Sequence, residues 1–224
     1  MITNSPFSGA DATVRDTDTL VRPATPEDAA ACAELIYLPM GRVADFLFGF
    51  DDPAFARLVL ARLLARRANR FSHEFADVAE AEGQVAGLLL GYPEHALAPM
   101  QLAMFRQLSV IYGWGQMLRF LRRTLPLARL AEAEAGEFCV FSVAVQPRFQ
   151  GRGIGTLLMH HAETRARLAG LSVCALGVEA DNDGARRLYE RLGYQVVATV
   201  RVPHLEARIG YPGFHRMTKR LPEF

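Results

Sequence analysis

The chain has 224 residues, half of them hydrophobic and 22% charged, a balance typical of a globular protein rather than a disordered or fibrous one. Its 25 basic and 24 acidic residues give a formal net charge of +1, so no overall positive field favours nucleic acid or an anionic membrane. Three scattered cysteines, Cys32, Cys139 and Cys174, match neither a metal-binding knuckle nor a disulfide framework, and they predict a reducing, cytoplasmic location.

The N-terminal segment, residues 1–18, contains three aspartates and no long apolar stretch. We therefore expect neither a signal peptide nor a membrane anchor there, but a disordered or loosely ordered extension. The remainder, residues 19–224, is predicted to form a single domain. Because no run of about 18 uncharged apolar residues occurs, we expect no stable membrane insertion.

The first part of this domain predicts a strand, two helices and a β-hairpin. Hydroxyl or acidic residues followed by proline, at Thr25-Pro26 and Asp52-Pro53, are typical helix starts. Alternating apolar residues on either side of Glu82-Gly83 indicate the hairpin. The predicted elements are a strand at 20–23, helices at 25–37 and 51–69, and hairpin strands at 75–81 and 84–90.

The second part predicts a helical insertion at about 95–135, broken near Gly113, Gly115 and Pro126, and then alternating strands and helices. A β-branched and aromatic run leads into a glycine-rich turn, and glycines follow both later helices. The predicted elements after the insertion are a strand at 138–145, a helix at 154–169, a strand at 171–178, a helix at 181–192, and strands at 194–202 and 216–221.

The glycine-rich turn joins a strand to a helix and reads Gln150-Gly151-Arg152-Gly153-Ile154-Gly155. Such a turn directs free backbone N–H groups toward one point, where a phosphate can bind, and glycines let the backbone approach the ligand closely. A P-loop is excluded because no Gly-Lys-Ser/Thr follows. The dinucleotide signature Gly-x-Gly-x-x-Gly is incomplete because Thr156 occupies its last position.

These residues resemble the cofactor signature of the GNAT superfamily of N-acetyltransferases, with Gln150, Gly153 and Gly155 at its defining positions. The lead-in Val143-Ala144-Val145-Gln146-Pro147 and the later segment 182–194 resemble further parts of that family's pattern. The resemblance implies an α/β (α+β) fold: a mixed, mostly antiparallel twisted sheet of six or seven strands. Helices would cover both faces, and the strands at 138–145 and 171–178 would splay apart.

By this resemblance, the chain would transfer an acetyl group from acetyl-CoA directly to a primary amine of a small molecule or peptide. Backbone groups of Val143 and Val145 would pair with the pantetheine arm, and Asn182 would contact it from the opposite wall. The hydroxyl of Tyr189 would protonate the departing thiolate. The backbone amides expected to bind the diphosphate belong to Gln150, Gly151, Arg152, Gly153, Ile154, Gly155 and Thr156.

A general base is the least determined part of the site. Glu137, at the entry of the strand at 138–145, is the preferred candidate, and Glu179 is the second. His161 is expected in the core and His160 at the surface, while neither His204 nor His215 is assigned a role. No metal is expected. Without a working base, the chain would instead be a non-catalytic sensor that binds acyl-CoA.

The insertion carries an apolar stripe, for which four roles are open. The favoured one is packing against the sheet; the others are roofing an acceptor pocket, forming a homodimer contact, or lying on a membrane with the arginines toward the headgroups. The apolar stripe consists of Trp114, Met117, Leu118, Leu121 and Leu125, and the basic stripe beside it of Arg119, Arg122 and Arg123.

Overall fold

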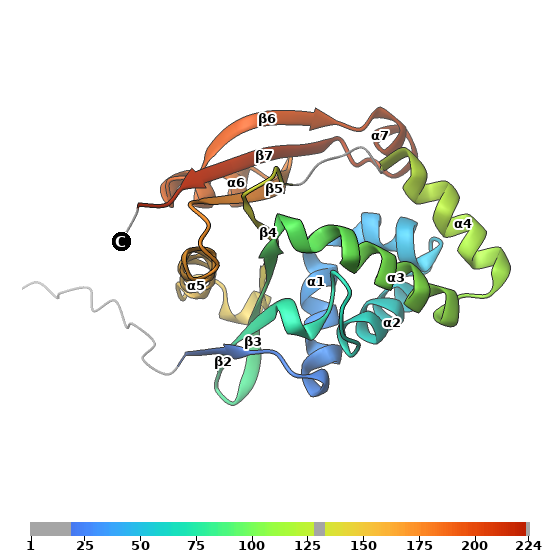
Figure 1. The fold of residues 1–224 in the computed structure, drawn as a ribbon, viewed down its shortest axis with the longest axis horizontal. Helices are drawn as coiled ribbons and strands as arrows, with labels where there is room; N and C mark the ends of the chain where they lie inside the picture. Colours follow the sequence, from blue (N-terminus) through green and yellow to red (C-terminus); the bar gives the residue numbers. More distant parts are fainter. Residues whose placement is uncertain (1–18, 128–132, 223–224) are drawn as a thin grey trace, which may run out of the picture.

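The computed structural model describes residues 19–127 and 133–222, and within them a seven-stranded sheet forms the centre of the domain (Figure 1). The strand order is β1-β2-β3-β4-β5-β7-β6, and every neighbouring pair is antiparallel except β4 and β5. The strands are β1 (Leu20–Pro23), β2 (Ala76–Ala81), β3 (Gln84–Pro93), β4 (Phe138–Val145), β5 (Val173–Glu179), β6 (Gln195–Arg201) and β7 (Gly213–Arg220).

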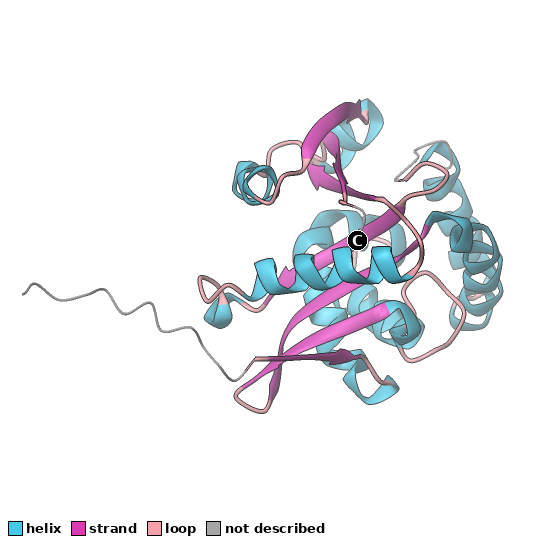
Figure 2. Ribbon diagram, turned by 60° about the vertical axis from the view of Figure 1, so that its left-hand side comes forward, coloured by secondary structure: helices cyan, strands magenta, loops and turns pink. Residues whose placement is uncertain are grey.

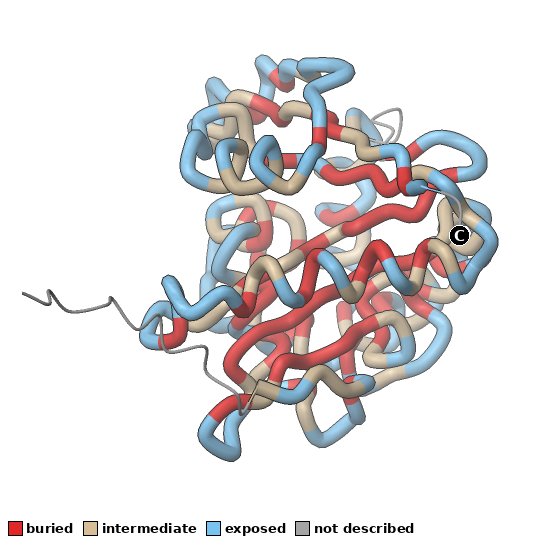
Figure 3. Tube along the Cα trace, turned by 90° about the vertical axis from the view of Figure 1, so that its left-hand side faces the viewer, coloured by how far each residue is buried: buried red, intermediate tan, exposed pale blue. Residues whose placement is uncertain are grey.

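Helices cover both faces of this sheet, as the sequence predicted (Figure 2). One apolar cluster joins α1 and α2 to β3, while a second joins α5 and the apolar side chains of α6 to β4 and β5. Burial is concentrated along the central strands, between these two helical layers (Figure 3). The helices are α1 (Ala29–Ala44), α2 (Pro53–Leu64), α3 (Leu97–Ile111), α4 (Trp114–Thr124), α5 (Ile154–Leu168), α6 (Asp183–Arg191) and α7 (Pro203–Ile209).

Local sequence signals predicted where the helices begin more accurately than where they end. The Asp52 side chain caps α2 by accepting hydrogen bonds from the amides of Ala54 and Phe55. The helix stops at Leu64, before the predicted end at Asn69. The physical reason is the Asn69 side chain, which donates to the Leu63 carbonyl at 2.9 Å and thereby competes with the helical backbone pattern.

Two further elements differ from the sequence prediction. Helix α1 continues to Ala44 rather than ending near Tyr37; it contains Pro39 and a sharp break at Gly41, where φ is 33° and ψ is −114°. Helix α7 was not predicted at all. Its seven residues begin with a proline and end before Gly210, which has a positive φ of 71°, so both boundary signals are present around a very short apolar pattern.

The predicted packing of the insertion's apolar stripe against the sheet is wrong for four of its five residues, while Met117 is half-buried and packs against the cluster that includes β3. Trp114 is 96% exposed, and Leu118, Leu121 and Leu125 are also exposed. The residue of α4 that enters the core is Phe120, which lies on a different side of the helix. No helix in the described part of the chain reaches the length and apolar character that crossing a bilayer requires.

The sheet divides where β4 meets β5. Their parallel pairing covers only three residue pairs, from Phe138↔Cys174 to Val140↔Leu176. Between Val140 and Ser142 the register of β4 against β3 shifts, and Phe141 is the extra residue of a β-bulge. Because a bulge bends its strand and increases local twist, β4 turns away from β5 beyond Val140. We call this divergence the splay.

Candidate functional site

The turn after β4 forms a cradle of backbone amides at the start of α5. Gly151 and Gly153 adopt positive φ angles of 79° and 83°, and a Cβ at either position would meet no protein atom within 4 Å. The first helical hydrogen bond runs from the Leu157 amide to the Gly153 carbonyl at 3.0 Å. The amides of residues 154–156 therefore have no acceptor within the helix, as a site for an anion requires.

The edge of β4 that faces the splay carries the backbone groups of Val143 and Val145. The amide of Gln146 donates to the Ala86 carbonyl of β3 at 2.8 Å. Alternate residues of a strand direct their N–H and C=O groups to opposite sides, so those of Val143 and Val145 point away from β3. The Val145 carbonyl accepts a hydrogen bond from the Gln150 side chain at 3.2 Å, which agrees with this direction.

Helix α6 lies beside the cradle. A Cβ added to Gly155 would lie 3.9 Å from Leu188 of α6 and 3.9 Å from Val145 of β4, so the start of α5 adjoins both elements. Asn182 is the N-cap of α6, its side-chain oxygen accepting from the Ala185 amide at 3.0 Å. The oxygen of Asn182 is thus engaged by the helix, and its amide nitrogen is the group left for a ligand.

Tyr189 projects from α6 onto the apolar cluster beside the splay. Its ring packs against Tyr194, with centroids 6.1 Å apart, and the described residues offer its hydroxyl no hydrogen-bond partner. Burial raises the pKa of Tyr189 to about 12, because the apolar surroundings disfavour the phenolate. The hydroxyl therefore keeps its proton at neutral pH and is suited to donate it.

The two arginines near the cradle are anchored to the β2–β3 hairpin. Arg152 forms an ion pair with Glu82 at 2.7 Å, and Arg148 donates to the side chain of Gln84. Both guanidinium groups also lie over the ring of Phe149. These contacts fix the outer wall of the turn and partly neutralise Arg152, so the cradle relies mainly on its backbone amides.

The structure places Glu137 in a buried ion pair. Its two side-chain oxygens accept hydrogen bonds from Arg216 at 2.7 and 2.6 Å, and one of them also accepts from the Glu134 amide at 2.7 Å. Glu137 is 8% and Arg216 is 7% exposed. A carboxylate engaged in this way must give up hydrogen bonds before it can take a proton, so the geometry favours a structural role.

Glu179 ends β5, on the strand that forms the other side of the splay. It is partly exposed and pairs with Arg42, which also lies 3.4 Å from Asp181. Arg42 follows the break in α1 at Gly41, so the unexpected extension of that helix carries a cation to the end of β5. Among the two carboxylates predicted as bases, Glu179 is the one with access to solvent.

Sequence reasoning missed Ser142, which lies directly after the bulge in β4. Its side chain is buried, with 7% exposure, and the Oγ atom has no hydrogen-bond partner among the described residues. A buried hydroxyl without a partner is uncommon and is explained most simply by a ligand or a water. A lone serine in an apolar strand gives no signal of this kind in the sequence.

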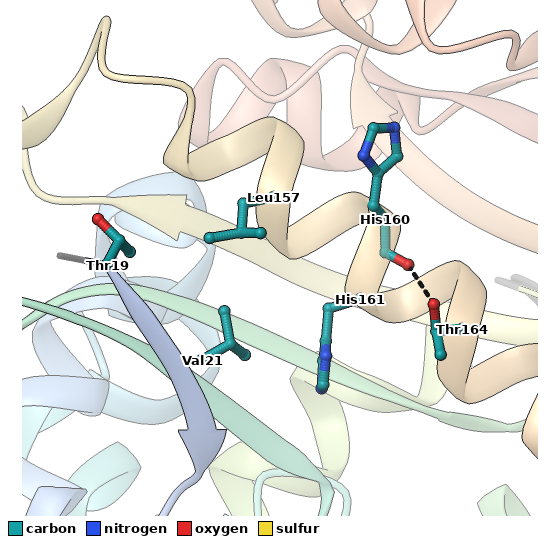
Figure 4. Close-up of a pocket in the computed structure, with 6 residues that line it drawn as sticks. All are labelled: Thr19, Val21, Leu157, His160, His161 and Thr164. Carbon is teal, nitrogen blue, oxygen red and sulfur yellow. Dashed lines mark hydrogen bonds between the residues drawn. The ribbon is translucent and has the colours of Figure 1, made fainter. Parts of the chain in front are cut away.

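The predicted surface position of His160 is confirmed, but His161 is not a core residue. The side chain of His161 is one-third exposed, its Nε2 lies 3.4 Å from Asp77, and both histidines line a shallow pocket of about 310 Å³ (Figure 4). This pocket lies between the start of β1 and α5, and none of its lining residues belongs to the cradle. The described residues contain no group of three or more side chains placed to hold a metal ion.

Comparison with curated proteins finds N-acetyltransferases. The chain is 32% identical over 95 residues to an uncharacterized N-acetyltransferase of Methanocaldococcus jannaschii, covering 42% of this chain and 36% of that protein. It is 40% identical over 65 residues to the [ribosomal protein bS18]-alanine N-acetyltransferase of Salmonella typhimurium (29% and 43%). It is 30% identical over 165 residues to the mycothiol acetyltransferase of Kocuria rhizophila (71% and 48%). The chain thus spans less than half the length of each.

Solved structures of acetyltransferases share the fold. A crystal structure of an acetyltransferase superimposes with a TM-score of 0.68 at 25% identity, covering 91% of this chain and all of the other. An N-acetyltransferase from Staphylococcus aureus Mu50 gives a TM-score of 0.69 at 19% identity, covering 89% and 100%. The sequence profile described as "Acetyltransferase (GNAT) family" matches residues 43–194, which include the cradle, the splay and Tyr189. The chain therefore belongs to the acetyltransferase (GNAT) family.

Proposed function

We propose that this chain transfers an acetyl group from acetyl-CoA to a primary amine of a small molecule or a peptide, by direct attack within a ternary complex. The observation that supports this best is the conjunction of an amide cradle, an unpaired strand edge and the Tyr189 side chain around one splay. Acetyl-CoA supplies a thioester: the C–N bond forms at its acyl carbon, the C–S bond breaks, and a thiolate departs.

The residues of the cradle fit a diphosphate. The amides of residues 151–156, on a turn whose two left-handed glycines leave open space, match the donors that such an anion needs. The helix dipole of α5 adds roughly 0.3–1 kcal/mol for a negative charge at this end. Backbone groups of Val143 and Val145 would hold the pantetheine arm as an added strand.

Tyr189 is the proposed proton donor to the thiolate. The raised pKa of about 12 keeps the hydroxyl protonated at neutral pH, so it can donate a hydrogen bond to the developing thiolate and supply the proton as the C–S bond breaks. The attacking amine must also lose a proton, because an alkyl amine of pKa about 10.4 is largely cationic at neutral pH. Of the two candidate bases, Glu179 is favoured by its exposure, and Glu137 is retained as the alternative.

The binding half of the proposal can be tested on the cradle. Gly153→Ala would place a Cβ in the open space of the turn and would strain the backbone by about 1 kcal/mol at its positive φ. We expect calorimetry with coenzyme A to show at least about tenfold weaker binding. Gly115→Ala on α4, where no protein atom lies within 4 Å, is the matched control and should bind like the unmodified chain. Equal affinity in all three proteins would refute the cradle.

The chemical half is tested by release of the CoA thiol from acetyl-CoA in the presence of a panel of primary amines and peptides. Turnover with at least one amine is the expected result. Coenzyme A binding and protection of residues 143–156 from hydrogen exchange, without turnover on any amine, would instead favour an acyl-CoA sensor. The structure gives a reason to test for this outcome, because both candidate carboxylates are held in ion pairs.

A further inference from the structure

The outer face of α4 is an apolar stripe that the described chain leaves uncovered. The helix runs along the right-hand edge of the molecule (Figure 1). At 100° per residue, the four exposed side chains of this stripe fall within about 60° of one another around the helix axis. They are Trp114, Leu118 and Leu121 of α4 and Leu125 directly after its end, whereas the fifth residue of the predicted stripe, Met117, is half-buried.

The inner side of α4 is firmly attached, so the stripe is a fixed surface. Phe120 is buried and packs against the rings of Phe105 and Tyr112. Arg123 forms an ion pair with Asp51 at 2.8 Å and lies over the ring of Phe46. The helix therefore cannot rotate its apolar face inward without breaking these contacts.

All charged residues of the segment 97–127, which includes α3 and α4, are basic. Residues 97–127 contain four arginines and no aspartate or glutamate, although the whole chain is almost neutral. Arg123 is neutralised by Asp51, whereas Arg106, Arg119 and Arg122 are exposed and form no ion pair with any described residue. By helical geometry, Arg122 directly flanks the stripe, and Arg119 lies further around the helix, between Arg122 and the anchored Arg123.

We propose that α4 docks on an anionic lipid bilayer, with the stripe at the level of the acyl chains and Arg119 and Arg122 among the headgroups. An aromatic ring and leucines on one face, with arginines at its flank, are the composition of a helix that lies in a membrane interface. A second copy of the chain, packed against the stripe about a twofold axis, is the less favoured partner. It would bring unpaired arginines of two copies together, and residues 97–127 contain no aspartate or glutamate to balance them.

Trp114 provides the test, because it is the only tryptophan of the chain and is almost fully exposed. We expect its emission to shift to the blue, and the full-length protein to sediment, with vesicles of phosphatidylcholine and phosphatidylglycerol but not of phosphatidylcholine alone. Arg119→Glu/Arg122→Glu should weaken binding at least about tenfold. Leu118→Ser/Leu121→Ser should weaken binding and remove the shift.

The matched control is Arg191→Glu/Arg220→Glu, which changes the charge equally at exposed positions outside the insertion and should bind like the unmodified chain. Equal binding to neutral and anionic vesicles, or equal loss in the control, would overturn the proposal. So would a blue shift that appears without lipid as protein concentration rises, together with a dimer mass by light scattering; that result would assign the stripe to a second copy.

Discussion

Replacing Glu137 by glutamine tests whether this residue is structural or catalytic. The substitution keeps the size and shape of the side chain but removes the charge that balances Arg216, which is 7% exposed. Breaking one partner of a buried pair costs about 3–5 kcal/mol, because the other charge stays buried without compensation. Glu134, 3.5 Å from the same Arg216 nitrogen but largely exposed, offsets part of this loss. We expect Glu137→Gln to lower the free energy of unfolding by about 3 kcal/mol.

The assay is urea unfolding followed by circular dichroism, with acetyl transfer measured well below the transition. Glu137→Met/Arg216→Met is the matched control: it removes both charges and should be within about 1 kcal/mol of the unmodified chain. If Glu137→Gln left the unfolding free energy unchanged, a structural role for the pair would be refuted. If turnover of that stable variant also fell and its pH dependence on the acidic side vanished, Glu137 would be the base.

Three further outcomes are expected. Tyr189→Phe should reduce kcat by about 10²–10⁴ with little change in the Kd for coenzyme A. The rate of the unmodified chain should not fall as pH rises from 8 to about 11, because the raised pKa of Tyr189 keeps its hydroxyl protonated over that range. Ser142→Ala should leave the free energy of unfolding unchanged or slightly higher, because it deletes a hydroxyl without a hydrogen-bond partner. In steady-state assays, the KM for acetyl-CoA or for the amine should rise. Arg22 lowers the pKa of Asp28 to about 2, so about 2 kcal/mol of stability is present above pH 4 and is lost as pH falls toward 2; Asp28→Asn should flatten acid unfolding over that range.

Features that depend on a few adjacent residues could be predicted from the sequence. The hairpin over Glu82-Gly83 has both turn residues at positive φ, as a two-residue turn requires, and β4 has the predicted bounds. The strand-to-helix turn over residues 150–155 was predicted from its three glycines, and two of them, Gly151 and Gly153, have left-handed backbone that favours glycine. Local sterics decide these features, so one short segment carries the whole signal.

Features that depend on distant partners could not be predicted. The Glu137–Arg216 pair joins residues 79 positions apart, and neither segment alone distinguishes a buried ion pair from loop charge. Periodicity showed that Trp114 and Leu118 share a face of α4, but it contains no information about what that face meets. The contact between Arg42 and Glu179 depends on a helix extension through a proline, which sequence rules treat as a stop.

The position of the site follows from the one parallel pair in the sheet. The strands β1 to β4 form one antiparallel unit and β5, β7 and β6 form another, so β4 and β5 are the only seam between them in the described sheet. Ligands bind at the carboxyl ends of such parallel strands because neighbouring connections leave in different directions. Here the bulge at Phe141 ends the pairing early, and the backbone groups of Val143 and Val145 are directed into the splay without a strand to meet them. A backbone group left unpaired costs about 1–3 kcal/mol once it is buried. An extended ligand can pair with this strand edge while its anionic end reaches the free amides at the start of α5. Such a ligand removes the cost of unpaired backbone groups at both places, and for this reason we place the acyl donor in the splay.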